Sequence, residues 1–216
     1  MATLDDTDVT VANVLTRYLR LQQIASNYWP SSMFMMPCPS CRGVGCARCR
    51  GLGYEEHERE AQRITEDNPR LDALRQELHG DRQTTVWVRF QQDAQDVMEL
   101  CRIEGIPAAR YDGTTSQADK VAALASYKRA EVQVLVASPR AAGRGLTLDN
   151  TSVVINYSHY FSLLLRQQAD ARSVGARNTV SYVDLIAVDT VDEIIVDALL
   201  RKKSLSDLIT EKAKIL

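Results

Sequence analysis

Four cysteines lie close together in the segment PCPSCRGVGCARCRGLGY of this 216-residue chain. The segment holds two consecutive copies of the pattern CxxCxGxG, and two such pairs of thiolates satisfy the tetrahedral coordination of Zn²⁺. The spacer between the pairs spans roughly 13 Å when extended, so all four sulfurs can reach one ion. A shell of four sulfurs leaves no open position, which predicts a structural rather than a catalytic zinc. The predicted ligands are Cys38, Cys41, Cys46 and Cys49.

Two other interpretations of these cysteines are disfavoured. The N-terminus, MATLDDTDVT, lacks the basic head and apolar core of a signal peptide, so we expect a reducing compartment in which disulfides are rare. A redox-active CxxC is expected in a thioredoxin-like βαβ setting, which the neighbouring sequence lacks. Arg42, Arg48 and Arg50 decorate the same segment. They fit either ordinary solvated arginines or a small basic surface for a nucleic-acid backbone.

Glycines and arginines form a second group with binding chemistry, in the segments PRAAGRGL and RQQADAR. Gly143 and Gly145 lack a Cβ and so let the backbone approach a ligand closely. Arg144 and Arg172 carry permanent charge, and their forked donors match phosphate oxygens in pairs. Gln168 precedes Arg172 by four residues and would share its helix face. A tight strand-to-helix turn beside a solvated arginine is the simpler alternative.

Strand-length apolar runs indicate how these residues are positioned. VQVLVA and SVVIN lack polar alternation and are typical of strands buried on both faces of a parallel sheet, while SLLLRQQADAR is an amphipathic crossover helix. Parallel α/β sheets bind ligands beyond the carboxyl ends of their strands. Two loops fall at that edge and suit phosphate: PRAAGRGL after VQVLVA, and YSHYFS before the arginine-bearing helix. Capping residues predict helices that start after Asn68, Asp93, Ser116 and Thr190. The five expected strands are TVWVRF, PAARY, VQVLVA, SVVIN and VSYVDLIA.

Composition limits the classes of function. The chain is 45% hydrophobic and 25% charged, with no apolar run long enough to span a membrane. Its net charge of −2 and pI near 6.0 give no overall attraction to nucleic acid. Any nucleic-acid binding must therefore come from a local patch.

Between residues 84 and 210 the order of segments resembles the second RecA-like lobe of superfamily-two helicases, in particular Swi/Snf-type translocases and their phage relatives. TVWVRF resembles the fourth motif, YDGTTS the short DG element, ASPRAAGRGLTL the fifth motif and RQQADAR the start of the sixth. The resemblance implies an α/β fold, a RecA-like parallel sheet flanked by helices, to which the cysteine pattern adds a small four-cysteine zinc-binding insert near the N-terminus. It divides the chain into an N-terminal packing helix (1–30), a zinc-knuckle insert with its linker (31–67) and a C-terminal lobe with a helical tail (68–216).

In that family, ATP and Mg²⁺ lie between this lobe and a first lobe that carries the Walker loop. The sequence has no GxxxxGK[ST] segment and no DExH-like tetrad, so the chain alone should not hydrolyse ATP. The resemblance implies a separate Walker-containing first lobe and DNA, expected to be duplex, as partners. It assigns Arg172 to catalysis, Gly143, Arg144, Gly145, Gln168 and Arg172 to the nucleotide, and Arg89, Thr114 and Thr115 to nucleic acid. A strand-end arginine that reaches solvent is the alternative for Arg89, and a helix cap by Thr115 or Ser116 is the alternative for the threonine segment.

One departure from the family weakens the catalytic interpretation. The sixth motif normally contains a second arginine, and two residues are missing after Arg172 where it belongs. Either the arginine finger is lost, or Arg172 or Arg177 takes its place. The alternative function is a catalytically inactive binding module with structural zinc. The cysteine repeats also resemble those of J-domain co-chaperones, although the J domain is absent. A chain without a targeting signal is expected in the cytoplasm of a bacterial or phage-infected cell.

Overall fold

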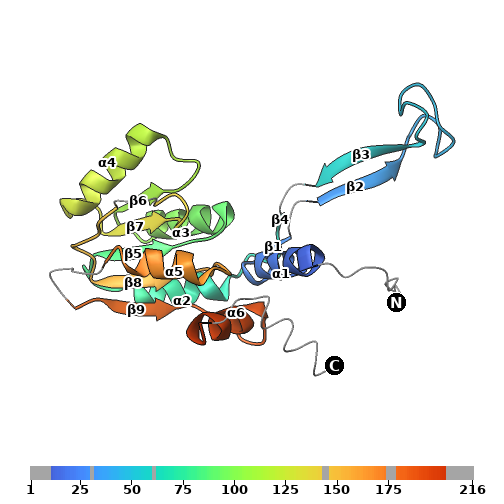
Figure 1. The fold of residues 1–216 in the computed structure, drawn as a ribbon. Helices are drawn as coiled ribbons and strands as arrows, with labels where there is room; N and C mark the ends of the chain where they lie inside the picture. The colour runs from blue at the N-terminus through green and yellow to red at the C-terminus, as the bar shows by residue number, and fades with distance from the viewer. Residues whose placement is uncertain (1–10, 30–31, 60–61, 143–145, 174–178, 203–216) are drawn as a thin grey trace. The chain divides into compact units, whose positions relative to one another are not determined.

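The structure is a computed structural model that describes residues 11–29, 32–59, 62–142, 146–173 and 179–202. The chain forms two compact units. The sheet unit combines Met1–Ser26 with Asp67–Leu216, and the hairpin unit consists of Asn27–Glu66 (Figure 1).

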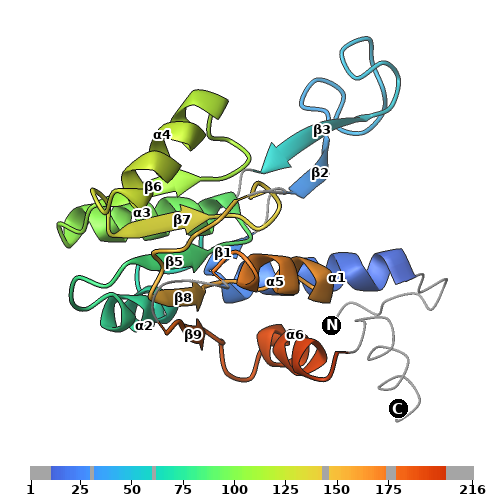
Figure 2. The same ribbon diagram turned by 60° about the vertical axis from the view of Figure 1, so that its left-hand side comes forward.

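The sheet unit contains a five-stranded sheet in the order β6-β7-β5-β8-β9 (Figure 2). Every pair of neighbouring strands is parallel, as the apolar runs predicted. The predicted α/β fold with a RecA-like sheet is therefore confirmed. The strands are β5 (Thr84–Trp87), β6 (Ala108–Tyr111), β7 (Val134–Ala137), β8 (Val153–Asn156) and β9 (Ser181–Asp184).

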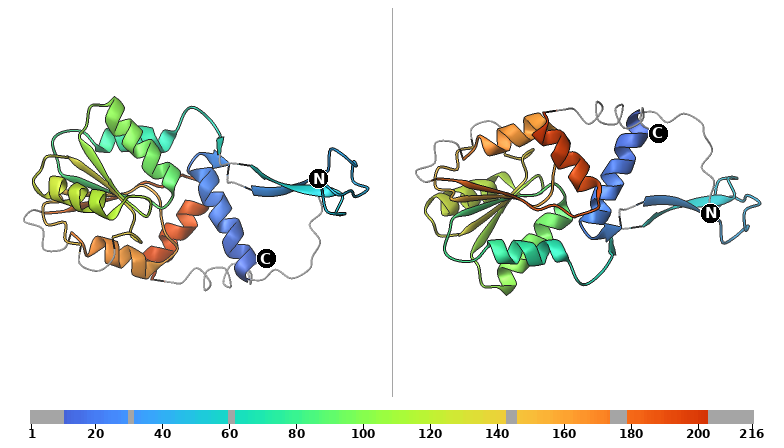
Figure 3. Two further views of the ribbon diagram at one scale, coloured as in Figure 1. Left: turned by 90° about the horizontal axis from the view of Figure 1, so that it is seen from above. Right: turned by 90° about the horizontal axis from the view of Figure 1, so that it is seen from below.

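Helices cover both faces of this sheet (Figure 3). Because successive side chains of a strand point to opposite faces, Val134 and Val136 pack against one helical layer, and Leu135 and Ala137 against the other. The first layer is α2 (Pro69–Glu77) with α3 (Gln91–Ile103), and the second includes α4 (Gln117–Lys128) and α5 (Leu163–Asp170). The three central strands are thus buried on both sides, which explains why their sequences lack polar alternation.

Three of the four predicted helix starts are confirmed by side-chain caps. The oxygens of Asn68, Ser116 and Thr190 accept hydrogen bonds from backbone amides in the first turns of α2, α4 and α6 (Val191–Leu200). The prediction for Asp93 is wrong, because α3 already begins at Gln91. The Asp93 carboxylate lies in the first turn and accepts from the N–H of Phe90 at 3.4 Å.

Helices α1 (Val11–Ala25) and α6 pack together beside the carboxyl ends of the strands (Figure 2). Tyr18 of α1 meets Phe161 edge-on, with 6.3 Å between ring centroids. The buried guanidinium of Arg70, in α2, forms an ion pair with Asp192 at the start of α6. Its Nη1 donates to Ser26 Oγ at 3.2 Å and to the Tyr157 carbonyl at 3.1 Å. One arginine of α2 therefore connects the residues that directly follow α1 and β8 to the start of α6.

The hairpin unit is a two-stranded antiparallel ribbon. Its long strands are β2 (Ser32–Pro37) and β3 (Tyr54–Arg59), and a short pairing of β1 (Tyr28–Trp29) with β4 (Gln62–Arg63) closes its base. Residues 38–53, which contain the four clustered cysteines, form the loop between the long strands (Figure 1). Across the residues that the structure describes, no helix combines the length and apolarity needed to span a lipid bilayer.

Candidate functional site

The four cysteine sulfurs of the hairpin unit converge on one point, all within 4.8 Å of one another. Cys38 Sγ lies 3.8 Å from Cys46 Sγ, and Cys41 Sγ lies 3.7 Å from Cys49 Sγ. A tetrahedral Zn²⁺ with Zn–S bonds of about 2.3 Å separates its sulfurs by about 3.8 Å. The group can therefore hold a metal ion, and its spacing fits the donor set that was predicted for zinc.

Backbone N–H groups donate hydrogen bonds to two of these sulfurs and so stabilise the thiolate form that binds a cation. The N–H groups of Cys46 and Gly53 each donate to Cys49 Sγ at 3.2 Å, and Gly45 N–H donates to Cys41 Sγ at the same distance. The Cys46 amide, together with that of Gly53, lowers the pKa of Cys49 to about 6, which favours the thiolate that metals bind. Burial instead raises the pKa of Cys38 to about 12, so its thiolate form needs a nearby positive charge.

The glycines of the two CxxCxGxG copies allow the backbones of the copies to lie in close contact. A Cβ on Gly45 would lie 2.7 Å from the carbonyl oxygen of Gly51 in the other copy. A Cβ on Gly53 would lie 2.3 Å from the carbonyl oxygen of Gly43. All four glycines also have positive φ, which L-residues rarely adopt. The GxG element of each copy is therefore explained by a tight turn and by contact with its counterpart.

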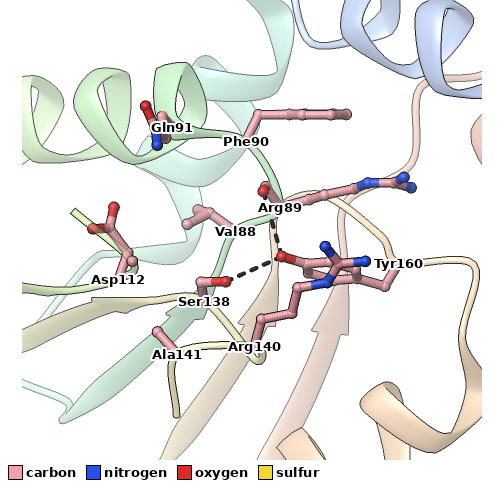
Figure 4. Close-up of a pocket in the computed structure, with 10 residues that line it drawn as sticks. Val88, Arg89, Phe90, Gln91, Asp112, Ser138, Arg140, Ala141 and Tyr160 are labelled. Carbon is pink, nitrogen blue, oxygen red and sulfur yellow. Dashed lines mark hydrogen bonds between the residues drawn. The ribbon is translucent and has the colours of Figure 1, made fainter. Parts of the chain in front are cut away.

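A pocket of about 310 Å³ opens at the carboxyl ends of β5, β6 and β7 in the sheet unit (Figure 4). Tyr160 forms part of its wall, and its hydroxyl lies 3.0 Å from Ser138 Oγ. The guanidinium carbons of Arg89 and Arg140 each lie 5.4 Å from the centroid of the Tyr160 ring. Within the described part of the chain, Arg140 has no carboxylate partner and is exposed. Two cations around one ring at this edge suit an anionic ligand.

The side chain of Arg89, predicted to contact nucleic acid, is held by the protein. It bonds to the Gln22 side-chain oxygen of α1, donates to the His159 carbonyl at 3.1 Å, and lies over the Phe161 ring at 4.3 Å. Burial lowers its pKa to about 10, and the nearby charge of Arg140 contributes to the lowering. Arg89 therefore anchors α1 to the pocket wall, whether or not it also contacts a ligand.

Thr114 and Thr115, also predicted to contact nucleic acid, lie in the turn between β6 and α4. Both hydroxyls donate to Asp112 Oδ1, at 2.7 and 3.2 Å, and both backbone amides donate to the same oxygen. Arg110 pairs with the second oxygen of this carboxylate. The threonines thus have a structural role in shaping the turn beside the pocket. Their predicted contact with phosphate remains a prediction.

Among the predicted nucleotide residues, the structure describes Gln168 and Arg172. Gln168 is exposed on α5, but α5 ends at Asp170, so the expectation of a shared helix face is wrong. A final turn, in which Arg172 N–H donates to the Ala169 carbonyl at 3.1 Å, takes Arg172 past the helix end. The Arg172 carbonyl accepts from Leu148 N–H at 2.8 Å, which holds it beside the segment that follows β7. Residues 143–145, with their two glycines and Arg144, and residue 177 lie outside the described residues.

Sequence reasoning placed the loops PRAAGRGL and YSHYFS at this edge but did not single out Arg140, Ser138 and Tyr160, which line the pocket. Arg140 stands in the same PRAAGRGL segment as the glycines, three residues after the last residue of β7. Its position directly after a buried strand was the available signal, because such residues reach the carboxyl edge of a parallel sheet. Tyr160 had the same signal, because it lies in the YSHYFS loop four residues after the last residue of β8, but only the fold brings it between two arginines.

Comparison with known proteins gives one family. Residues 69–175 match the helicase conserved C-terminal domain. Over 87 residues the chain is 34% identical to the ATP-dependent RNA helicase DBP3 of Meyerozyma guilliermondii, a match that covers 40% of this chain and 16% of that protein. Among solved structures, the C-terminal part of the Fun30 ATPase domain is similar at 22% identity and a TM-score of 0.56, covering 61% of this chain and 45% of that one.

The helicase domain of Pyrococcus furiosus Hef is also similar, at 25% identity and a TM-score of 0.51. That match covers 61% of this chain and 29% of the Hef chain. The chain therefore spans less than half the length of each of these three relatives. The likeness to Fun30 concerns the fold alone.

Proposed function

We propose that this chain is the second lobe of an ATP-dependent translocase of Swi/Snf type that acts on duplex DNA. The starting point is its family, because the chain contains a helicase C-terminal domain, the RecA-like second lobe of superfamily-two helicases. A Walker-containing first lobe supplies the other half of the nucleotide site. The printed name of DBP3 makes RNA the competing substrate.

The observation that carries the proposal is the pocket at the carboxyl edge of the sheet. Arg140 projects there without an ion-pair partner among the described residues, next to Ser138 and the half-buried Tyr160. Phosphate groups are the anions that such an edge is suited to hold, and contacts to them are independent of base sequence. A translocase needs contacts of that kind, because it must move along any sequence.

The nucleotide would be held elsewhere on this lobe, by Gln168, Arg172 and the loop with Gly143, Arg144 and Gly145. Arg172 would orient its guanidinium toward the phosphates, and the hydrogen bond that its carbonyl accepts from Leu148 N–H would hold its backbone in place. Bound ATP and Mg²⁺ would supply the phosphoryl chemistry, which requires the first lobe. Closure of the two lobes would then move the nucleic-acid contacts relative to each other.

Arg140→Gln tests the nucleic-acid pocket. Binding of duplex DNA should weaken, and the slope of log K against log salt should fall by about 0.9, the value for one lost phosphate contact. Titrations with labelled duplex at several salt concentrations measure both quantities. Parallel titrations with single-stranded DNA and duplex RNA show which nucleic acid is preferred.

Arg129→Gln is the matched control, because Arg129 is exposed and already paired with Glu131 at 2.6 Å. It removes the same charge and should leave the slope unchanged. Equal slopes for the two variants would reject the pocket as a phosphate site. A preference for RNA over DNA would reject the Swi/Snf assignment.

We also propose that the cysteine cluster binds one structural Zn²⁺. The sulfur separations near 3.8 Å and the amide hydrogen bonds to Cys41 and Cys49 support it. The hairpin unit has very little apolar core in its described residues, where only Cys38 and Cys49 are buried hydrophobic residues. A bound metal would therefore supply much of the stability that such a small unit cannot obtain from packing.

Cys49→Ser should reduce the zinc content of the purified chain from one ion to well below one. Atomic absorption measures the metal, and far-UV circular dichroism should show that the helices of the sheet unit are retained. Cys101→Ser is the matched control, since Cys101 lies in the core of the sheet unit. Full zinc content in Cys49→Ser, or none in the parent chain, would contradict a four-cysteine zinc site.

A second candidate function is a non-catalytic binding module derived from a helicase lobe. The shortened sixth motif favours it, and so does the placement of Arg172 beyond the end of α5. Such a module would bind DNA with the same salt dependence but would ignore ATP and the Arg172→Ala substitution. DNA affinity measured with and without ATP, in the presence of a first lobe, separates the two functions.

A further inference from the structure

The cysteine loop of the hairpin unit is built from two copies of one short fold. CPSCRGVG at 38–45 is followed directly by CARCRGLG at 46–53. Arg42 and Arg50, at equivalent positions, have φ values of 50° and 51°. Equivalent hydrogen bonds run from Val44 N–H to the Cys41 carbonyl and from Leu52 N–H to the Cys49 carbonyl, both 3.0 Å long. The copies therefore repeat in backbone conformation as well as in sequence.

At equivalent positions, each copy presents one arginine and one aliphatic side chain to solvent. Val44 is 89% exposed and Leu52 is 69% exposed, and Arg42 and Arg50 are exposed as well. Within the described residues neither of these two arginines has an ion-pair partner. Arg48 differs, because its side chain pairs with Glu55 at 2.7 Å. The loop thus offers two unpaired guanidinium groups, each two residues from an exposed aliphatic group.

The conformation of the two arginines is a separate observation. Positive φ suits glycine or asparagine, and it strains a residue with a long side chain. Both copies nevertheless place an arginine there, although a glycine would satisfy the turn at lower cost. A strained backbone that recurs at two equivalent positions indicates that the guanidinium groups serve a purpose beyond the turn.

We propose that this loop is a second nucleic-acid contact, in which Arg42 and Arg50 bind phosphates of a DNA duplex while Val44 and Leu52 lie against the groove between them. The proposal rests on the proposed translocase function. The positive charges of Arg42 and Arg50 favour a polyanion, and the adjacent carboxylate of Glu55 is paired with Arg48 rather than with either of them. Proteins that enter a DNA groove commonly combine arginine with apolar side chains.

The test compares the full chain with its Arg42→Gln/Arg50→Gln variant in titrations of duplex DNA at several salt concentrations. Losing two phosphate contacts should lower the slope of log K against log salt by about 1.8. Val44→Ser/Leu52→Ser should weaken binding and leave the slope unchanged, because it removes apolar contact only. Zinc content and circular dichroism should match the parent chain in both variants.

Arg102→Gln/Arg129→Gln is the matched control. It removes the same two charges from exposed arginines that already pair with Glu99 and Glu131, so the slope should not change. An equal fall in slope for the control and the loop variant would overturn the proposal. So would an unchanged slope in the loop variant, or DNA binding that is intact while binding to an acidic protein partner is lost.

The Arg140→Gln variant keeps this proposal separate from the proposed function. A lower slope for Arg140→Gln with an unchanged slope for Arg42→Gln/Arg50→Gln would remove the loop contact and leave the translocase lobe standing. An unchanged slope for Arg140→Gln with a lower slope for Arg42→Gln/Arg50→Gln would retain the loop as the nucleic-acid contact and reject the pocket. No measurable DNA binding by the parent chain would overturn both.

Discussion

Replacing Arg70 by methionine should lower the free energy of unfolding by about 3–5 kcal/mol, because it leaves the Asp192 carboxylate buried without its counter-charge. The two side chains are only 6% and 1% exposed. The substitution also removes the donors to Ser26 and to the Tyr157 carbonyl, so α1 and α6 lose a shared attachment to the sheet. Denaturant unfolding followed by circular dichroism measures the loss.

The pH dependence of this loss has a definite sign. Burial raises the pKa of Asp93, beside the same network, to about 6, and the charge of Arg70 opposes that rise. A carboxyl whose folded pKa exceeds its unfolded value destabilises the fold as pH increases through that range. Removing Arg70 increases this effect, so the difference between variant and parent should be larger at pH 8 than at pH 5.

Two controls make the Arg70 prediction specific. Arg75→Met removes an exposed arginine of the same helix, paired with Asp72 and Glu104, and should cost at most about 1 kcal/mol. Arg70→Met/Asp192→Leu leaves neither charge of the pair buried and should recover part of the lost stability. An Arg70→Met variant as stable as Arg75→Met would contradict the role assigned to this ion pair.

The sheet was predictable from sequence because burial of a central strand excludes polar residues from both of its faces. VLVA of β7 and VVIN of β8 can therefore be recognised as buried strands from their sequences alone. The helix between β8 and β9 indicates that these two strands are parallel. Helix starts were predictable where the cap is a local side-chain bond, as at Asn68. The helix start predicted at Asp93 was wrong because an acidic residue is favourable in the first turn of a helix as well as at its cap.

The cysteine cluster was also predictable, since its ligands lie within a short segment and spacing alone brings the sulfurs together. The contacts that the polar residues of the sheet edge make were not predictable. Arg89 bonds to Gln22, 67 residues earlier in the chain, and no local pattern reveals that contact. The pairing of Arg140 with Tyr160 across the pocket likewise depends on the fold. Residues whose partners are distant in sequence need the structure for their interpretation.

The contact between Arg89 and Gln22 has a consequence for the two-lobed proposal. It attaches α1 to the same pocket wall that Tyr160 and Arg140 form. Under the proposed function, a nucleic acid in the pocket would therefore contact the residues that hold α1, so its binding would act on the attachment of that helix.

Arg172→Ala should reduce ATP hydrolysis by a factor of about 10³ or more when the chain is combined with a first lobe and DNA. The reason is electrostatic, since a guanidinium that stabilises charge on the transferred phosphoryl group acts mainly in the transition state. Arg201→Ala is the matched control, because Arg201 is exposed and paired with Asp197 at 2.7 Å. It should leave the rate unchanged.

Phosphate release should be measured for this chain, for a Walker-containing first lobe, and for their mixture with duplex DNA. We expect no turnover above background for either component alone, and DNA-stimulated turnover that depends on Arg172 in the mixture. Hydrolysis by this chain alone, abolished by Arg172→Ala, would contradict the claim that it supplies only one half of the nucleotide site.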